Sequence, residues 1–260
     1  MATPVVGSGR YGPVVSYREQ PVPPELRALA ECTWTSAAPV APERIDVLPD
    51  ACMDLVWSGA QLLVAGPDTA PHPFVRAAGV VATGLRFRPG VLSALLATPA
   101  GALRDARVPL DALHPRLARR ATALLESGMP AAAVLGMLAH RLPGPAPEPA
   151  VRAAATRLAR GASAADTADA LGWTTRSLHR HSVAAFGYGP AVLRRVLRFR
   201  RALALLRAGV APAEVAALAG YADQPHLSRE VRALAGVAPA QLGSGANRST
   251  PVPSGSWTTA

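Results

Sequence analysis

The stretches Leu178-His-Arg180 and Gly187-Tyr-Gly-Pro190 are repeated as Leu227-Ser-Arg229 and Gly236-Val-Ala-Pro239. Each landmark of the first copy is shifted by 49 residues in the second. A constant offset indicates that one supersecondary unit was built twice. This duplicated stretch therefore decides the fold of the second half of the chain.

A short Ala-rich stretch precedes each copy and ends in Gly and an aromatic residue, as Leu171-Gly-Trp173 and as Ala219-Gly-Tyr221. A helix, a turn that contains Gly and a second helix together form a helix-turn-helix. The sequence therefore predicts an all-α domain with two such units, in which Trp173 and Tyr221 pack between the paired helices. Residues suited to cap these helices are Ser163, Asp166, Thr174, Thr175 and Asp223.

One long helix is predicted between the two units, from Pro190 to about Ala208. A helix of roughly 18 residues is about 27 Å long, and it could hold two recognition helices near the ~34 Å that separates successive major grooves. A flexible linker would not fix that spacing. This helix carries five arginines, of which we expect some to meet phosphates: Arg194, Arg195, Arg198, Arg200 and Arg201.

The positive charge is concentrated on the duplicated part of the chain. Residues 151–242 hold 13 Arg against 5 Asp and Glu, a net of +8, whereas residues 1–150 hold 13 Arg against 12 acids, a net of +1. A GC-rich genome would account for a chain without Lys, but it would not account for this segregation. The distribution indicates a surface that binds a polyanion.

The exposed early positions of the two recognition helices are expected to enter the grooves of DNA. Arg can pair bidentately with guanine and Gln with adenine, while Ser and the helix N-termini suit phosphates. Arg180 and Arg229 could instead be solvated or paired within the protein, and the histidines could be exposed without touching DNA. The predicted DNA-binding residues are Arg176, Ser177, His179 and Arg180, then Gln224, His226, Ser228 and Arg229, with Arg194 and Arg198 on the connecting helix.

On these motifs, residues 151–242 resemble the DNA-binding domain of the AraC/XylS family of bacterial transcription regulators. The resemblance implies sequence-specific promoter binding by two helix-turn-helix units joined by a rigid helix. Ser182 and Val231 depart from the family pattern, which usually has an aromatic residue two positions after each recognition-helix Arg. Phe186 could replace part of the missing bulk, and the first unit is expected to be less tightly packed.

The first half of the chain is predicted to be an α+β domain, a small β barrel or sandwich followed by a helical hairpin. Expected strands lie at 44–49, 53–57, 61–65 and 80–87, and expected helices at 91–97, 115–126 and 130–141. The predicted domains are a regulatory or sensor domain over 1–142, a Pro-rich linker over 143–150, the DNA-binding domain over 151–242 and a disordered tail over 243–260. The first domain loosely resembles an uncharacterised N-terminal domain of actinobacterial members of the family, which implies a regulatory or dimerising role.

Sites for chemistry in the first domain are weakly indicated. Asp50 is expected to cap a turn, and Cys32 and Cys52 to be buried packing residues, although a methyl-accepting thiol is an alternative. Arg86 and Arg88 could bind an anionic effector or pair with Asp50 or Asp54. The histidines and cysteines show no metal-ligand spacing, so neither a metal nor a cofactor is expected.

The chain as a whole is expected to be a cytoplasmic, non-enzymatic regulator. Two cysteines in 260 residues fit a reducing compartment, and neither a signal peptide nor a membrane span is apparent. The expected partners are double-stranded promoter DNA, a small-molecule effector and a second copy of the chain in a homodimer. The competing hypotheses are an enzyme or methyl acceptor built on the first domain, and a nonspecific nucleic-acid scaffold.

Overall fold

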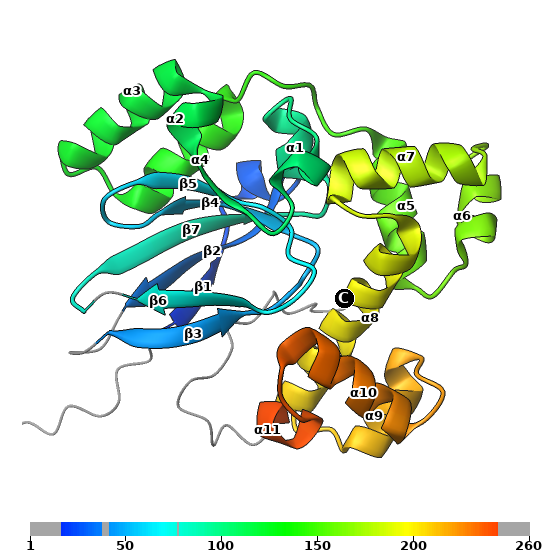
Figure 1. Ribbon diagram of the computed structural model, residues 1–260. Coiled ribbons are helices and arrows are strands. Elements are labelled where there is room, and N and C mark those ends of the chain that lie inside the picture. The colour runs from blue at the N-terminus through cyan, green and yellow to red at the C-terminus, as the bar shows by residue number, and fades with distance from the viewer. Residues whose placement is uncertain (1–16, 38–41, 77, 244–260) are drawn as a thin grey trace, which may run out of the picture.

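The computed structural model describes residues 17–37, 42–76 and 78–243. The first part is built on a six-stranded antiparallel sheet of order β1-β2-β7-β4-β5-β8, and a two-stranded ribbon, β3 with β6, lies apart from it. Figure 1 shows the ribbon on one side of the sheet and the helices α1 to α4 on the other. The strands are β1 (Tyr17–Pro21), β2 (Ala30–Ala37), β3 (Glu43–Val47), β4 (Met53–Trp57), β5 (Leu62–Ala65), β6 (His72–Arg76), β7 (Val81–Phe87) and β8 (Arg107–Pro109).

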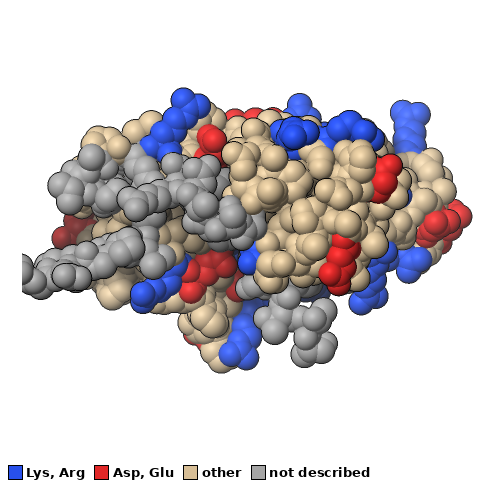
Figure 2. Space-filling model, turned by 90° about the horizontal axis from the view of Figure 1, so that it is seen from below, with Lys and Arg blue, Asp and Glu red and all other residues tan. Residues whose placement is uncertain are grey.

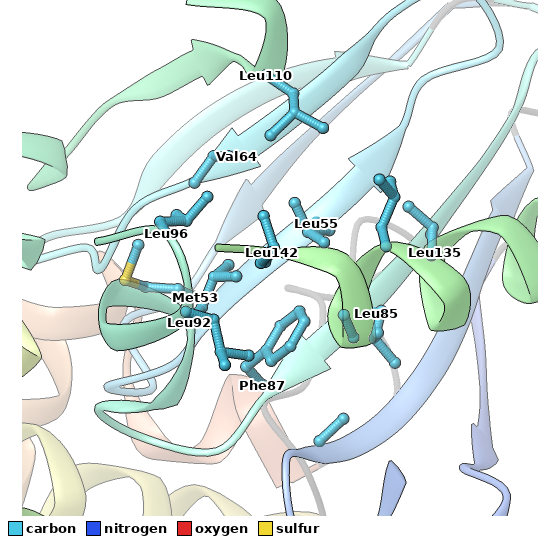
Figure 3. Packing of buried hydrophobic residues seen from close by; sticks show 14 of the residues in the cluster. Met53, Leu55, Val64, Leu85, Phe87, Leu92, Leu96, Leu110, Leu135 and Leu142 are labelled. Atoms are coloured by element: carbon cyan, nitrogen blue, oxygen red, sulfur yellow. The ribbon is translucent and has the colours of Figure 1, made fainter. Parts of the chain in front are cut away.

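Alternation along β4 shows how the sheet separates two environments. Met53 and Leu55 are buried, and they belong to the core that fills the space between the sheet and the helices. Asp54 and Val56 point to the opposite face of the strand, toward the ribbon. Figure 3 shows Leu55, Leu85 and Phe87 of the sheet meeting Leu135 and Leu142 of the helical layer.

The helices of the first part cover the apolar face of this sheet. They are α1 (Val91–Leu95), α2 (Leu110–Leu113), α3 (Pro115–Glu126) and α4 (Ala131–Arg141), with short 3₁₀ turns η1 (Pro24–Leu26) and η2 (Ala100–Leu103). α3 and α4 form the predicted helical hairpin, so the α+β fold class is confirmed. β3, β4, β5 and β7 match expected strands, but β1, β2, β6 and β8 were not predicted.

The second part is helical throughout, as predicted. Its helices are α5 (Pro149–Ala159), α6 (Ala164–Ala170), α7 (Thr175–Phe186), α8 (Pro190–Arg207), α9 (Pro212–Ala219), α10 (Gln224–Ala235) and α11 (Pro239–Gly243). In Figure 1, α7 and α10 lie at opposite ends of α8.

The predicted Pro-rich linker over 143–150 overlaps the start of α5. α5 begins at Pro149 because proline suits the first turn of a helix, where its missing N–H is not needed. Earlier in the segment, the Gly144 N–H donates to the Leu95 carbonyl, 2.8 Å away, so this backbone is tied to the end of α1. The predicted disordered tail lies outside the described residues, except for Gly243 at the end of α11.

Candidate nucleic-acid interface

The first helix-turn-helix unit consists of α6 and α7. The Ser163 side chain accepts from the Asp166 N–H and the Asp166 carboxylate accepts from the Ser163 N–H, which makes the predicted capping box at the start of α6. Gly172 turns the chain at φ +65°, a conformation that residues with a Cβ rarely adopt. The Thr174 hydroxyl then caps α7 by accepting from the Ser177 N–H at 3.1 Å.

The second unit, α9 and α10, is built in the same way. Gly220 ends α9 in the left-handed conformation, at φ +78°. Asp223 caps α10 by accepting from the His226 N–H at 2.6 Å, as predicted. Both recognition helices therefore begin with a side-chain cap that fixes where their first exposed residues point.

The predicted reading residues all lie on the first two turns of α7 and α10, and most are exposed. Within the described residues, none of the arginines at these positions forms an ion pair, so their guanidinium groups are available to a ligand. The exposed residues are Arg176, His179, Arg180, Gln224 and Arg229, and the half-buried ones are Ser177, His226 and Ser228.

The cores of the two units are arranged differently. Leu227 and Val231 belong to an extensive cluster together with Tyr221 and the second half of α8. By contrast, Leu178 lies in a small cluster with Ala154 and Ala168, with Trp173 packed beside it. Ser182 is buried, and its hydroxyl has no hydrogen-bond partner among the described residues. Trp173 also packs against the larger cluster of Val151, Phe186 and Leu193, so the first unit is packed through two clusters, and its looser packing stays a prediction.

Phe186 supplies packing for the first unit in a different way from that expected. It is fully buried, but it packs with Val151, Tyr188 and Leu193. A Cβ on Gly90, in the first part of the chain, would lie 2.8 Å from its ring. Its bulk therefore joins α7 to the N-terminal domain as well as to α8.

The connecting helix α8 is 18 residues long. Its apolar side is buried along the whole length, including Leu193, Leu197, Leu203 and Leu206. Arg194 and Arg201 are exposed. Figure 2 shows arginine side chains along both margins of the helical, right-hand part of this face, with acidic side chains between them.

Two arginines of α8 are instead engaged with the second unit. Arg195 pairs with Glu230 at 2.7 Å, and the Arg198 guanidinium lies 3.6 Å from the same carboxylate and 4.4 Å from the centre of the Tyr221 ring. These contacts orient α10 on α8. Part of the Arg198 side chain remains exposed, and only this part is available to a phosphate.

Arg200 does not face solvent at all. It is 2% exposed and pairs with Glu31 of the N-terminal domain. From the sequence, Arg200 was grouped with four other arginines of α8, of which some were expected to contact phosphates. No feature of the neighbouring sequence distinguishes Arg200 from the other four. Its partner Glu31 and the residue Leu48, which packs into the core of the second unit, were likewise not predicted.

The N-terminal domain also contacts the first unit, at the end of α7 away from the reading residues. The Ser93 hydroxyl donates to the Ala185 carbonyl at 2.9 Å, and Arg104 donates to the Gly187 carbonyl at 3.4 Å. This docking leaves the first two turns of α7 uncovered.

Arg86 is the centre of a buried charge cluster in the N-terminal domain. It lies 2.9 Å from Glu19, 3.2 Å from Asp50 and 3.6 Å from Asp54, so pairing within the protein, one of the two alternatives for Arg86, is realised. Burial raises the pKa of Asp54 to about 6, although the Arg86 charge opposes the shift. Asp50 also caps its turn as predicted, accepting from the Cys52 N–H at 2.8 Å.

The other chemistry-bearing residues of this domain fit structural roles. Cys32 and Cys52 are buried thiols, and burial raises the pKa of each. Arg88 donates to the Arg27 carbonyl. The described residues contain no group of three or more His, Cys, Asp or Glu placed to hold a metal ion. Nor does any described helix have the length and apolar composition to cross a lipid bilayer.

A small cavity of about 150 Å³ lies between the sheet and the β3–β6 ribbon. Its wall is mostly apolar and aromatic, with Tyr17, Trp34, Val56 and Phe74 among the lining residues. Asp54 and Arg86 form part of the same wall, and the Trp34 indole donates to Asp54 at 2.7 Å. The cavity therefore combines an apolar space with a charged end.

Two family models match the chain. Residues 167–244 match a helix-turn-helix domain, and residues 18–109 match a domain of unknown function, DUF6597. No curated protein matches the sequence.

Solved structures with the same kind of helical domain also resemble the chain. The C-terminal domain of AraT, a response regulator from Geobacillus stearothermophilus, is 24% identical over 37% of this chain and 84% of its own, with a TM-score of 0.35. A probable AraC family transcriptional regulator from Rhodopseudomonas palustris is 20% identical over 38% of this chain and 98% of its own, with a TM-score of 0.34. ToxT from Vibrio cholerae is 10% identical over 87% and 97%, with a TM-score of 0.45.

At these identities and TM-scores, the assignment depends on the helix-turn-helix match and on the duplicated motif that forms α6–α7 and α9–α10. Both capped recognition helices and the connecting helix stand where that motif requires them. The chain is a DNA-binding transcription regulator that carries an AraC-type helix-turn-helix domain, over residues 167–244, behind a domain of unknown function.

Proposed function

We propose that the two units read two successive major-groove segments of a promoter, with α7 in one segment and α10 in the next. The observation that carries this proposal is the exposure of the capped first turns of both helices at opposite ends of one rigid helix. α8, at about 27 Å, is close to one turn of B-DNA in length.

We propose that Arg180 and Arg229 make the main base contacts. They occupy equivalent positions in the duplicated motif, both are exposed, and an arginine there can bind guanine through two hydrogen bonds. Arg176, His179, Gln224 and His226 flank them. Ser177, Ser228, Arg194 and the exposed part of Arg198 are proposed to contact the phosphate backbone.

A gel-shift experiment tests sequence specificity. The probe is the duplex that the full-length chain selects from a random pool, and the comparison is a scrambled duplex of equal length at about 0.15 M salt. We expect at least a 10³-fold preference for the selected duplex, because specific sites are typically bound 10³–10⁷ times more tightly than nonspecific DNA. Equal affinities with a steep salt dependence would instead identify a nonspecific scaffold.

We further propose that the N-terminal domain modulates DNA binding when a small molecule occupies the cavity between the sheet and the β3–β6 ribbon. A cavity of this size accepts molecules about as large as benzene. Because the proposed regulator acts on promoter DNA, we infer that the protein is located in the cytoplasm. Its assembly into a homodimer stays a prediction.

Filling the cavity tests this second role. Val56 lines the cavity from β4, so a Val56→Phe substitution should occupy the space that a ligand needs. In a thermal-shift screen of neutral and charged aromatic fragments, we expect compounds that raise the melting temperature of the wild-type chain but not that of the variant. If every stabilising fragment acts equally on both, the cavity is not the effector site.

A further inference from the structure

The segment Leu48–Cys52, called here the joint, touches both helix-turn-helix units. Leu48 is 2% exposed and belongs to the core of the second unit, with Phe199, Leu203 and Leu227. Ala51, also 2% exposed, belongs to the cluster of the first unit. A stretch of five residues in the N-terminal domain therefore inserts one side chain into each half of the DNA-binding domain.

The same segment holds the middle of α8. Arg200 donates to the Asp50 carbonyl and to the Cys52 sulfur, each at 3.3 Å, and it pairs with Glu31 on β2. Each of these partners belongs to the N-terminal domain. A buried guanidinium is costly unless charge and hydrogen bonds compensate it, so α8 is strongly tied to this position.

The backbone of the joint is held in an uncommon conformation. Ala51 has φ +66°, in the left-handed region that non-Gly residues seldom occupy. Two contacts maintain this backbone conformation: the Cys52 N–H donates a hydrogen bond to the Asp50 carboxylate, and the Ala51 side chain is packed in the cluster of the first unit. Because these contacts hold the joint in an uncommon conformation, a change in them can shift the position of the joint.

Asp50 connects the joint to the cavity. Its Oδ2 atom lies 3.2 Å from Arg86 Nε, while its carbonyl accepts from Arg200. Arg86 and Asp54 line the cavity. One residue therefore separates the charged end of the cavity from the helix that spaces the two recognition helices.

We propose that the joint sets the mutual placement of the two helix-turn-helix units and transmits the state of the cavity to them. The second half of this statement rests on the proposed function of the cavity; the first half does not. The docked N-terminal domain leaves the first turns of α7 and α10 exposed, so it acts by fixing their placement rather than by covering them. Preorganisation of this kind favours a two-site operator, because less freedom is lost on binding.

Removal of the Glu31 carboxylate tests the joint in a residue remote from the proposed DNA surface. In Glu31→Ala, we expect affinity for the selected duplex to fall about ten-fold, within the range of allosteric couplings, and affinity for a half-site duplex to change less than two-fold. Glu25→Ala removes the same charge from the exposed η1 turn and should change neither affinity. If Glu31→Ala fails to fold, Leu48→Ala provides the same test. We expect it to lower affinity for the selected duplex and to leave affinity for the half-site duplex nearly unchanged.

A measurement without DNA separates the joint from the proposed function. Spin labels on Thr175→Cys and Ala233→Cys, which are exposed positions of α7 and α10, report the distance between the two recognition helices. We expect a narrow distance distribution in the otherwise unchanged chain and a broader or displaced one in Glu31→Ala and Leu48→Ala.

The outcomes are distinguishable. The proposed role of the joint is wrong if the variants leave the distance distribution unchanged, or if they lose equal affinity for the full and half-site duplexes. If no duplex is selected from the random pool, the DNA-reading proposal fails, and the spin-label distances still decide whether the joint places the two units.

Discussion

The Arg180→Ala/Arg229→Ala double variant is expected to bind the selected duplex about 2–6 kcal/mol more weakly than the wild-type chain. Each arginine is exposed at the equivalent position of one recognition helix, and loss of one bidentate base contact costs about 1–3 kcal/mol. The two residues lie in different units at opposite ends of α8, so their effects should add.

Affinities measured by fluorescence anisotropy at several salt concentrations distinguish the kind of contact. Loss of a base contact leaves the salt dependence nearly unchanged and relaxes the sequence preference at one position, whereas loss of a phosphate contact lowers the slope by about one. The Arg116→Ala/Arg119→Ala variant, which removes the same charge from exposed positions of α3, serves as the matched control. A loss of affinity as large in this control would show that only net charge matters.

Phe199→Ala is expected to lower the free energy of unfolding by about 3–5 kcal/mol, the usual cost of removing a buried phenyl ring. Phe199 is fully buried near the middle of α8, in the cluster shared by the second unit and Leu48. Its loss should therefore loosen both the second unit and the contact with the joint.

Urea unfolding followed by circular dichroism measures this loss. Val192→Ala, on the exposed side of the same helix at 38% exposure, should stay within about 0.5 kcal/mol of the wild-type chain. A Phe199→Ala variant as stable as Val192→Ala would mean that α8 is not anchored through this cluster.

The sequence alone was sufficient to predict the DNA-binding domain. Its duplication, the capping residues Ser163, Thr174 and Asp223, and the extent of α8 all depend on local geometry and helical periodicity, which are encoded in consecutive residues. The same holds for the exposure of Arg180 and Arg229, since both follow a buried leucine by two positions.

The N-terminal domain was predicted less completely. β4, β5 and β7 carry apolar runs between turn residues. β1 and β2 mix charged and hydroxyl side chains, and β2 also pairs with β7, far along the chain. β6 pairs with β3, across 25 or more residues. β2 alternates apolar and polar residues from Ala30 to Thr35, so a period-2 signal was present there and was missed. β1 and β6 are five residues long and each contains a proline, and they carry no such signal.

What the sequence by itself determined is a pair of helix-turn-helix units on one connecting helix, because each unit is specified by contacts within a few tens of residues. Only the tertiary structure decided that Arg200 is buried against Glu31, and that Leu48 and Ala51 each pack into one unit. The Arg200–Glu31 pair joins residues 169 positions apart in the sequence. The sequence alone does not distinguish an exposed arginine from a buried one. Burial, and with it the choice between binding a partner and binding the protein's own acid, is set by packing that no local pattern encodes.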